Sequence, residues 1–251
     1  MEQVQVGQFE AGSSVDEPAP ATPAPGRQTS LVIAVDGPGG SGKSTVAREV
    51  ARRLGLRYLD TGAMYRALTW LALQRRVDVE DAETLSEMAE QVVLSIDTDP
   101  DAPTISIDGE DVTEPIRTRQ VTNAVSAVSA VPAVRKELVR RQQNLIAAAD
   151  PGIVVEGRDI GSVVVPEAPV KLFLTASTEV RARRRSAELG EQGADAVART
   201  HSELERRDSL DSGRSASPLL QAPDALVIDS TSMSAGEVAD LVVQRVGGDR
   251  T

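Results

Sequence analysis

The stretch GPGGSGKST, residues 37–45, constrains this chain more than any other part of its sequence. Its spacing of glycines, lysine and hydroxyl residues is that of a P-loop, in which backbone N–H groups surround a polyphosphate. An apolar, β-branched run at 31–35 precedes it, as is typical of a buried parallel strand. After it, apolar residues recur at helical spacing as far as Gly55, a common helix-ending residue. Strand, glycine loop and helix in this order favour a phosphate-binding site over a chance glycine-rich turn.

The loop residues have separate predicted roles. Lys43 would reach the β- and γ-phosphates of a nucleotide, and the Ser44 hydroxyl would be a ligand of Mg²⁺. The following helix would add partial positive charge at its N-terminus. The residues predicted to bind the nucleotide are Gly37, Pro38, Gly39, Gly40, Ser41, Gly42, Lys43, Ser44 and Thr45.

Charge and composition exclude several function classes. The 27 basic and 38 acidic residues give a net charge of −11, which argues against a general binder of nucleic acids or acidic membranes. The chain has no cysteine, so disulfides, a thiolate nucleophile and a zinc–cysteine cluster are excluded. His201, the single histidine, has polar neighbours and is expected at the surface rather than as a base. Without an apparent membrane span or signal peptide, the chain is expected in the cytoplasm.

Further strand patterns follow the P-loop and alternate with helical sequence. Short apolar runs at 57–59, 153–155, 170–174 and 225–229 join 31–35 to predict a doubly wound sheet of five parallel strands. Residues 92–113 differ, because apolar and polar residues alternate on both sides of a turn-forming stretch, which predicts a small antiparallel sheet. The aspartates in that turn lack the glycine and glutamate of a calcium loop, so a solvated hairpin is favoured.

Composition divides the chain into a core and three other segments. Residues 1–29 are rich in Pro and Ala and are predicted to be a disordered tail. The P-loop core is predicted at 30–78, 132–180 and 215–251, with an insert at 79–131 and an arginine-rich helical lid at 181–214.

Polar residues directly after two predicted strands are candidates for substrate contact. Thr61, Tyr65 and Arg66 follow the second strand, and Arg158 and Asp159 follow the strand at 153–155. Ligands of open α/β sheets bind at the carboxyl ends of the strands, which favours function. The alternatives are ordinary helix surface for the first group and an internal Arg–Asp pair for the second.

The segment 181–214 holds eight arginines and seven carboxylates. One interpretation is a solvated helix pair with many ion pairs. The other is a mobile lid whose guanidinium groups stabilise a phosphoryl group during its transfer, and this interpretation is favoured. The arginines are Arg181, Arg183, Arg184, Arg185, Arg199, Arg206, Arg207 and Arg214.

The ordered motifs of residues 31–246 resemble the bacterial cytidylate kinases, or CMP kinases, of the nucleoside monophosphate kinase group. The resemblance implies phosphoryl transfer from ATP to CMP or dCMP, with Mg²⁺, and an insert that binds the monophosphate. The motifs are IAVDGPGGSGKST (33–45), LDTGAMYR (59–66), DGEDVTEPIRT (108–118), EGRDIGSVVVPEAPVKLFL (156–174), RRDSLDSGR (206–214) and LVIDST (226–231). Arg206 stands where the family pattern leads us to expect a glutamate.

The resemblance also implies roles for individual residues. Arg66 and Arg158 look like contacts of the CMP phosphate, and Ser126, Arg135 and Asp159 look like contacts of the cytosine edge. Asp211 and Arg207 look like partners of the ribose. Arg184 and Arg214 look like lid arginines on the transferring phosphate, so the predicted catalytic residues are Lys43, Arg158, Arg184 and Arg214.

Three rival functions were weighed against this one. A GTPase switch lacks support, because neither Asn123 nor Asn144 begins an NKxD motif. A kinase for another small molecule, such as another nucleoside monophosphate or shikimate, is disfavoured by the resemblance alone. A non-catalytic scaffold is disfavoured by the intact Lys43 and Ser44. The acidic balance favours a monomer, and the resemblance implies ATP and CMP or dCMP as its partners.

Overall fold

The structure is a computed structural model that describes residues 30–191, 193–213 and 219–248. The predicted tail at 1–29 and the predicted catalytic residue Arg214 lie outside the described residues. No helix among the described residues is long and apolar enough to cross a membrane.

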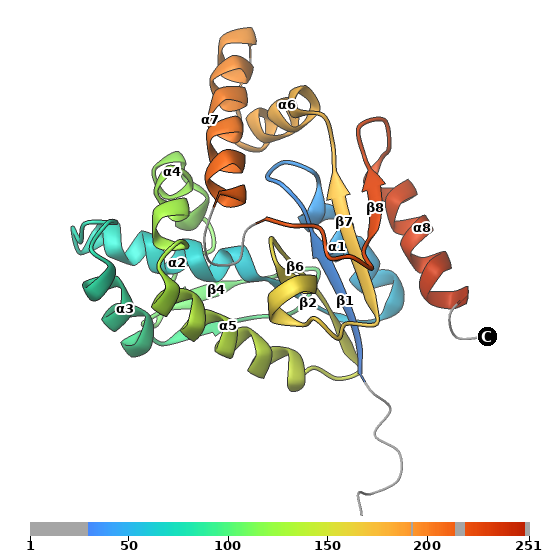
Figure 1. Ribbon diagram of the computed structural model, residues 1–251, viewed down its shortest axis with the longest axis horizontal. Coiled ribbons are helices and arrows are strands. Elements are labelled where there is room, and N and C mark those ends of the chain that lie inside the picture. The colour runs from blue at the N-terminus through green and yellow to red at the C-terminus, as the bar shows by residue number, and fades with distance from the viewer. Residues whose placement is uncertain (1–29, 192, 214–218, 249–251) are drawn as a thin grey trace, which may run out of the picture.

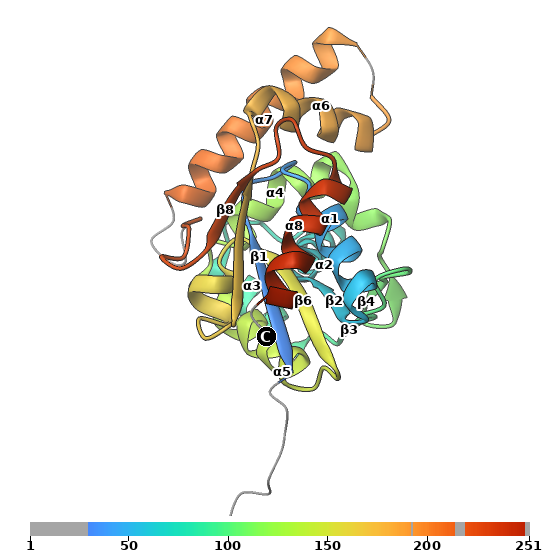
Figure 2. The ribbon, with the colours of Figure 1, turned by 90° about the vertical axis from the view of Figure 1, so that its right-hand side faces the viewer.

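A parallel sheet of five strands forms the centre of the molecule and confirms the predicted fold class (Figures 1 and 2). Its order is β2-β6-β1-β7-β8, so the P-loop strand β1 lies in the middle between β6 and β7. The strands are β1 (Leu31–Asp36), β2 (Arg57–Asp60), β6 (Gly152–Gly157), β7 (Val170–Thr175) and β8 (Leu226–Asp229).

Helices cover both faces of this sheet. On one face, α1 (Lys43–Leu54) and α8 (Ala235–Gly248) pack on an apolar cluster that contains Ile33, Val154 and Leu172. On the other face, α5 (Pro132–Ala147) and the short turn η2 (Ile160–Val164) pack on a second cluster. The helix α1 ends at Gly55, which adopts a left-handed conformation that a residue with a Cβ rarely adopts.

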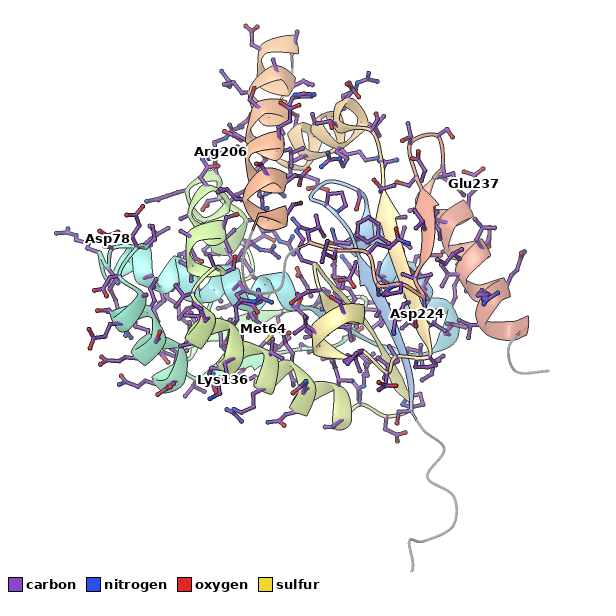
Figure 3. The ribbon with its side chains drawn as sticks, in the orientation of Figure 1. Met64, Asp78, Lys136, Arg206, Asp224 and Glu237 are labelled. Atoms are coloured by element: carbon purple, nitrogen blue, oxygen red, sulfur yellow. The ribbon has the colours of Figure 1, made fainter. Side chains whose placement is uncertain are left out.

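The segment between β2 and α5 forms a separate layer of helices and a small sheet. Its three short strands pair antiparallel in the order β3-β4-β5, as the alternating pattern predicts. A large apolar cluster joins this sheet to α2 and α5. The elements are α2 (Thr61–Gln74), α3 (Ala82–Gln91), β3 (Leu94–Ile96), β4 (Ile105–Ile107), β5 (Glu110–Asp111), η1 (Pro115–Arg117) and α4 (Arg119–Val128). In Figure 3, Met64 of α2 lies in the interior, whereas Asp78 and Lys136 lie at the periphery.

The loop between β3 and β4 is attached to the P-loop helix. Arg48 donates to the carbonyl oxygens of Pro100 at 2.7 Å and Asp101 at 2.9 Å. Arg52 forms an ion pair with the Asp101 carboxylate. The small sheet is therefore held against α1 as well as against α2.

Two helices stand above the carboxyl ends of the central strands (Figure 1). They are α6 (Thr178–Glu188) and α7 (Ala194–Ser212), and they pack against each other, with a hydrogen bond of 3.1 Å between the buried hydroxyl groups of Ser186 and Thr200. Arg206 projects from α7 toward solvent (Figure 3). These helices occupy most of the segment predicted as a helical lid.

Candidate active site

The chain turns sharply after β1 into the P-loop. Gly37 has a φ of 147°, and a Cβ there would lie 2.0 Å from the carbonyl oxygen of Leu174. At Gly40, with a φ of 74°, a Cβ would lie 2.8 Å from the carbonyl oxygen of Arg181. Both positions require glycine, because the backbones of β7 and α6 approach the loop so closely.

Lys43 and Ser44 open the helix that follows the loop. The Lys43 ammonium group is buried and donates to the carbonyl oxygen of Pro38 at 2.8 Å. Burial, together with the positive charge of Arg158, lowers the pKa of Lys43 to about 7. Ser44 and Thr45 are exposed and line a cavity. A phosphate in this cavity would meet the helix N-terminus and both of these hydroxyl groups.

The cavity has a volume of about 680 Å³, and the residues that line it include residues of the P-loop, α2, α4, α6 and α7. Gly37, Pro38, Ser41 and Arg184 do not line it. The predicted site residues that line it are Gly39, Gly40, Gly42, Lys43, Ser44, Thr45, Thr61, Tyr65, Arg66, Ser126, Arg135, Arg158, Asp159, Arg207 and Asp211.

Two of the cavity arginines are paired with a carboxylate at the carboxyl end of a strand. Arg66 forms an ion pair of 2.6 Å with Asp60, whose other oxygen caps the N-terminus of α2 by accepting from the Ala63 N–H at 3.0 Å. Arg135 forms a buried ion pair with Asp159 and lies over the ring of Tyr65, 5.5 Å from its centroid. The arginines are thus held in fixed positions around the cavity.

Asp211 brings the lid helix α7 into this site. Its buried carboxylate accepts from Arg158 at 2.8 Å and from the Ser126 hydroxyl at 3.3 Å. Arg158 also donates to the carbonyl oxygen of Gly37 at 2.8 Å, so it connects lid and P-loop. Arg207 lies 3.8 Å from Asp211, and burial, with Arg158 nearby, lowers its pKa to about 9.

Two further lid arginines contact the P-loop from outside the cavity. Arg184 donates to the carbonyl oxygen of Ser41 in the P-loop at 3.5 Å, to the Ser230 hydroxyl at 3.0 Å and to the Ser230 carbonyl oxygen at 2.8 Å. Arg181, which was not selected from the sequence, donates to the Gly39 carbonyl oxygen at 3.2 Å and pairs with Asp208 of α7. In this arrangement both side chains support the loop and the lid, and the predicted contact between Arg184 and the transferring phosphate stays a prediction.

Glu156 is a site residue that the sequence interpretation missed. It is the second-last residue of β6, beside the P-loop strand, is buried, and accepts a hydrogen bond from the Tyr58 hydroxyl. Burial and the nearby Asp60 raise the pKa of its carboxyl group. Its position directly before the Gly-Arg-Asp stretch at a strand end was the available signal.

The residues beside the P-loop fit a magnesium ion that is shared with a nucleotide. Among the described residues, no group of three or more acidic, histidine or cysteine side chains could hold a metal alone. Mg²⁺ is usually held by one or two protein oxygens together with substrate phosphates and water. The Ser44 hydroxyl and the Glu156 carboxylate, which line the same cavity, supply such a pair of oxygens.

Asp36 was also missed, and it organises the polar segment after β6. The Asp36 carboxylate accepts from the N–H groups of Ile160 and Gly161, both at 2.8 Å. Burial raises its pKa to about 6. Because Arg158 and Asp159 directly precede this anchored turn, Asp36 fixes the backbone that carries them.

A set of polar contacts joins the insert to the lid helices. Arg119, at the start of α4, pairs with Glu191 at 2.7 Å and with Glu203 of α7. From α6, Arg185 donates to the Thr122 hydroxyl of α4 at 3.1 Å. Arg119, Thr122, Arg185 and Glu203 line the same cavity.

The sequence matches known kinases along nearly all of its described length. A family model described as cytidylate kinase matches residues 33–247. A cytidylate kinase of Streptomyces griseus is 51% identical over 223 residues, 89% of this chain and 95% of that protein. One of Mycolicibacterium paratuberculosis is 51% identical over 212 residues, 84% of this chain and 92% of that protein. Among solved structures, a shikimate kinase of Acinetobacter baumannii in complex with shikimate aligns at 14% identity and a TM-score of 0.43, over 88% and 95% of the two chains.

Proposed function

This chain belongs to the cytidylate kinase family, and we propose that it transfers the γ-phosphoryl group of ATP to CMP or dCMP in the cavity described above. The products are ADP and CDP or dCDP. The observation that carries the proposal is that a P-loop and a separate ring of arginines face one cavity. A donor and an acceptor phosphate can therefore meet there, as in-line transfer requires.

The donor side is the P-loop. The N–H groups of the loop and the start of α1 would bind the phosphates of ATP, and Lys43 would leave the Pro38 carbonyl oxygen to contact the γ-phosphate. Arg184 would approach from the outer side of the loop.

The acceptor side is formed by α2, α4, the turn after β6, and α7. Arg66 and Arg158 would bind the CMP phosphate, because their guanidinium groups are held at two sides of the cavity. Ser126, Arg135 and Asp159 supply donors and an acceptor for the cytosine edge. Asp211 and Arg207 would contact the ribose. These assignments follow the family resemblance.

The reaction requires no strong base. A monophosphate oxygen is already an anionic nucleophile, so the described residues mainly bind, orient and exclude water. Lys43, Arg158 and the lid arginines would stabilise the charge that develops on the phosphoryl group as it is transferred. Arg214 lies outside the described residues, and its proposed role is the one that the family resemblance implies.

Magnesium is part of this proposal. Ser44 and Glu156 would hold it, directly or through water, together with the phosphates of ATP. When bound, Mg²⁺ neutralises negative charge between the β- and γ-phosphates.

The remaining partner assignments are also proposals. The net charge of −11 supports small anionic substrates bound at local cation sites rather than a nucleic-acid or membrane partner. We further propose that the protein works as a monomer in the cytoplasm, which sedimentation and cell fractionation would test.

A coupled assay of ADP formation tests the acceptor. With ATP and Mg²⁺, turnover with CMP and dCMP should far exceed turnover with UMP, AMP, GMP and dTMP. Asp159→Ala should raise the KM for CMP while leaving the KM for ATP within about twofold, because the proposal assigns Asp159 to the acceptor alone. Equal turnover with all six monophosphates, or an equal rise of both KM values, would contradict the proposed cytosine contacts.

A further inference from the structure

A buried tyrosine supports the carboxylate of Glu156 from the neighbouring strand. Tyr58 lies on β2 and is 3% exposed. Its hydroxyl donates to Oε1 of Glu156, which is itself 4% exposed. None of the roles proposed above uses Tyr58.

The sheet register brings these two side chains together. Tyr58 pairs with Val154 and Asp60 pairs with Glu156, so the tyrosine lies two residues earlier along the neighbouring strand. Tyr58 and Val154 belong to the apolar cluster under α1. Side chains alternate between the two faces of a strand, so Glu156 is on the same face as Val154 and Tyr58. The phenol therefore reaches diagonally along this face toward the P-loop.

Glu156 has a competing partner in this pocket. Lys43 is buried nearby and its charge acts on Glu156, yet no ion pair joins the two among the described residues. The carboxylate is instead bound by the hydroxyl group of Tyr58, and it lines the same cavity as Ser44. The Lys43 ammonium group binds a neutral carbonyl oxygen. A phosphate can displace this partner more easily than it could displace a buried carboxylate.

We propose that Tyr58 is a positioning residue: its hydroxyl holds the Glu156 carboxylate beside Ser44 and away from Lys43. The carboxylate then remains available to the magnesium ion of the nucleotide, and the lysine remains available to the phosphates. The inference rests on the proposed function, because it assumes that Mg²⁺ is held at Ser44 and Glu156.

Binding of Mn²⁺ in the presence of ADP, followed by electron paramagnetic resonance, tests this proposal without turnover. Tyr58→Phe removes the hydroxyl and keeps the ring. We expect it to weaken Mn²⁺ binding about tenfold, the lower end of the effect of losing an outer-shell partner. The KM for CMP should change less than twofold. Thr69→Val, which removes a buried hydroxyl outside the cavity, is the matched control and should leave metal binding unchanged.

A double-mutant cycle separates positioning from general stability. If Tyr58 acts through Glu156, Tyr58→Phe should add nothing to the loss of Mn²⁺ affinity caused by Glu156→Gln. If Tyr58→Phe lowers the Mn²⁺ affinity of the Glu156→Gln variant as much as it lowers that of the unaltered protein, the proposal is overturned. Unchanged metal binding by Tyr58→Phe, beside a clear loss in Glu156→Gln, overturns the role of Tyr58 and leaves the proposed metal site intact.

A further outcome would contradict the proposed metal site at Ser44 and Glu156 itself. If Glu156→Gln binds Mn²⁺ as the unaltered protein does, the proposed metal site is wrong and the inference about Tyr58 falls with it. Should Tyr58→Phe fail to fold, Tyr58→Leu serves as the second variant, because it also removes the hydroxyl and does not overfill the buried position.

Discussion

Lys43 shows how burial can connect nucleotide binding to pH. Its side chain is 7% exposed, and burial lowers its pKa to about 7. In the free protein the ammonium group therefore loses its proton as the pH rises through this value. A bound polyphosphate favours the charged form and raises the pKa again.

We predict that ATP binding is accompanied by proton uptake above pH 7. At pH 8 most free Lys43 is neutral, so binding should take up almost one proton per nucleotide. The affinity for ATP should fall between pH 7 and pH 9 for the same reason. Calorimetry in buffers with different ionisation enthalpies measures the uptake directly. Lys43→Met should abolish it, and a buffer-independent heat in the unaltered protein would show that the pKa is not lowered.

Sequence spacing predicts the P-loop residues well and predicts their neighbours poorly. The roles of Lys43 and Ser44 follow from a local motif. Glu156 and Tyr58 lie 98 positions apart, and only the pairing of β2 with β6 brings them together. Arg184 illustrates another limit: the family resemblance implies its contact with the phosphate, and no local pattern indicates that the turn at Ser230 binds its guanidinium group.

At the scale of elements, α4 and the lid helices are connected by charge as well as by packing. Arg119 bridges Glu191 and Glu203, and all three side chains are about one-third exposed. Ion pairs of this exposure contribute roughly 0.2–1 kcal/mol each and are weakened by salt.

Arg119→Gln should weaken closure of the lid on the insert. We expect the KM for CMP to rise about two- to fivefold, which corresponds to the free energy that one or two such ion pairs contribute. Salt at about 1 M should raise the KM of the unaltered protein toward that of the variant, because it screens the same pairs. Steady-state kinetics over a salt series measure both effects. Arg140→Gln, which removes an exposed pair on α5, is the control, and an equal effect in both variants would refute the lid contact.

The elements themselves are largely predictable from local patterns. The five parallel strands, the small antiparallel sheet and the helical segment after β7 are present as predicted. The order of strands in the sheet is not contained in any local pattern, since it depends on which faces the helices cover. The predicted limits of insert, core and lid stay predictions, and the cluster that joins α2 and α5 to the small sheet shows why such limits are hard to place.

At the scale of the whole molecule, separate apolar clusters stabilise the insert side and the central sheet. Leu68 is fully buried in the insert-side cluster, and Val50 is fully buried under the sheet.

Leu68→Ala should lower the free energy of unfolding by about 2–5 kcal/mol, because it leaves a cavity in the larger cluster. Hydrogen exchange should quicken first in α3, α4 and the small sheet, and later in β1 and β6. Val50→Ala should show the opposite order. Uniform acceleration throughout the described chain in both variants would mean that the two sides unfold together.

The arginine–carboxylate pairs of the cavity have a consequence for an acidic protein that binds anions. Both proposed phosphate-binding arginines, Arg66 and Arg158, already carry a counter-ion within the chain. Binding of a nucleotide phosphate is therefore an ion exchange, in which one anion displaces another, rather than the neutralisation of a bare cation. A nucleoside without a phosphate brings no anion to exchange. Cytidine would therefore leave Asp60 and Asp211 paired with their arginines, as they are in the empty cavity.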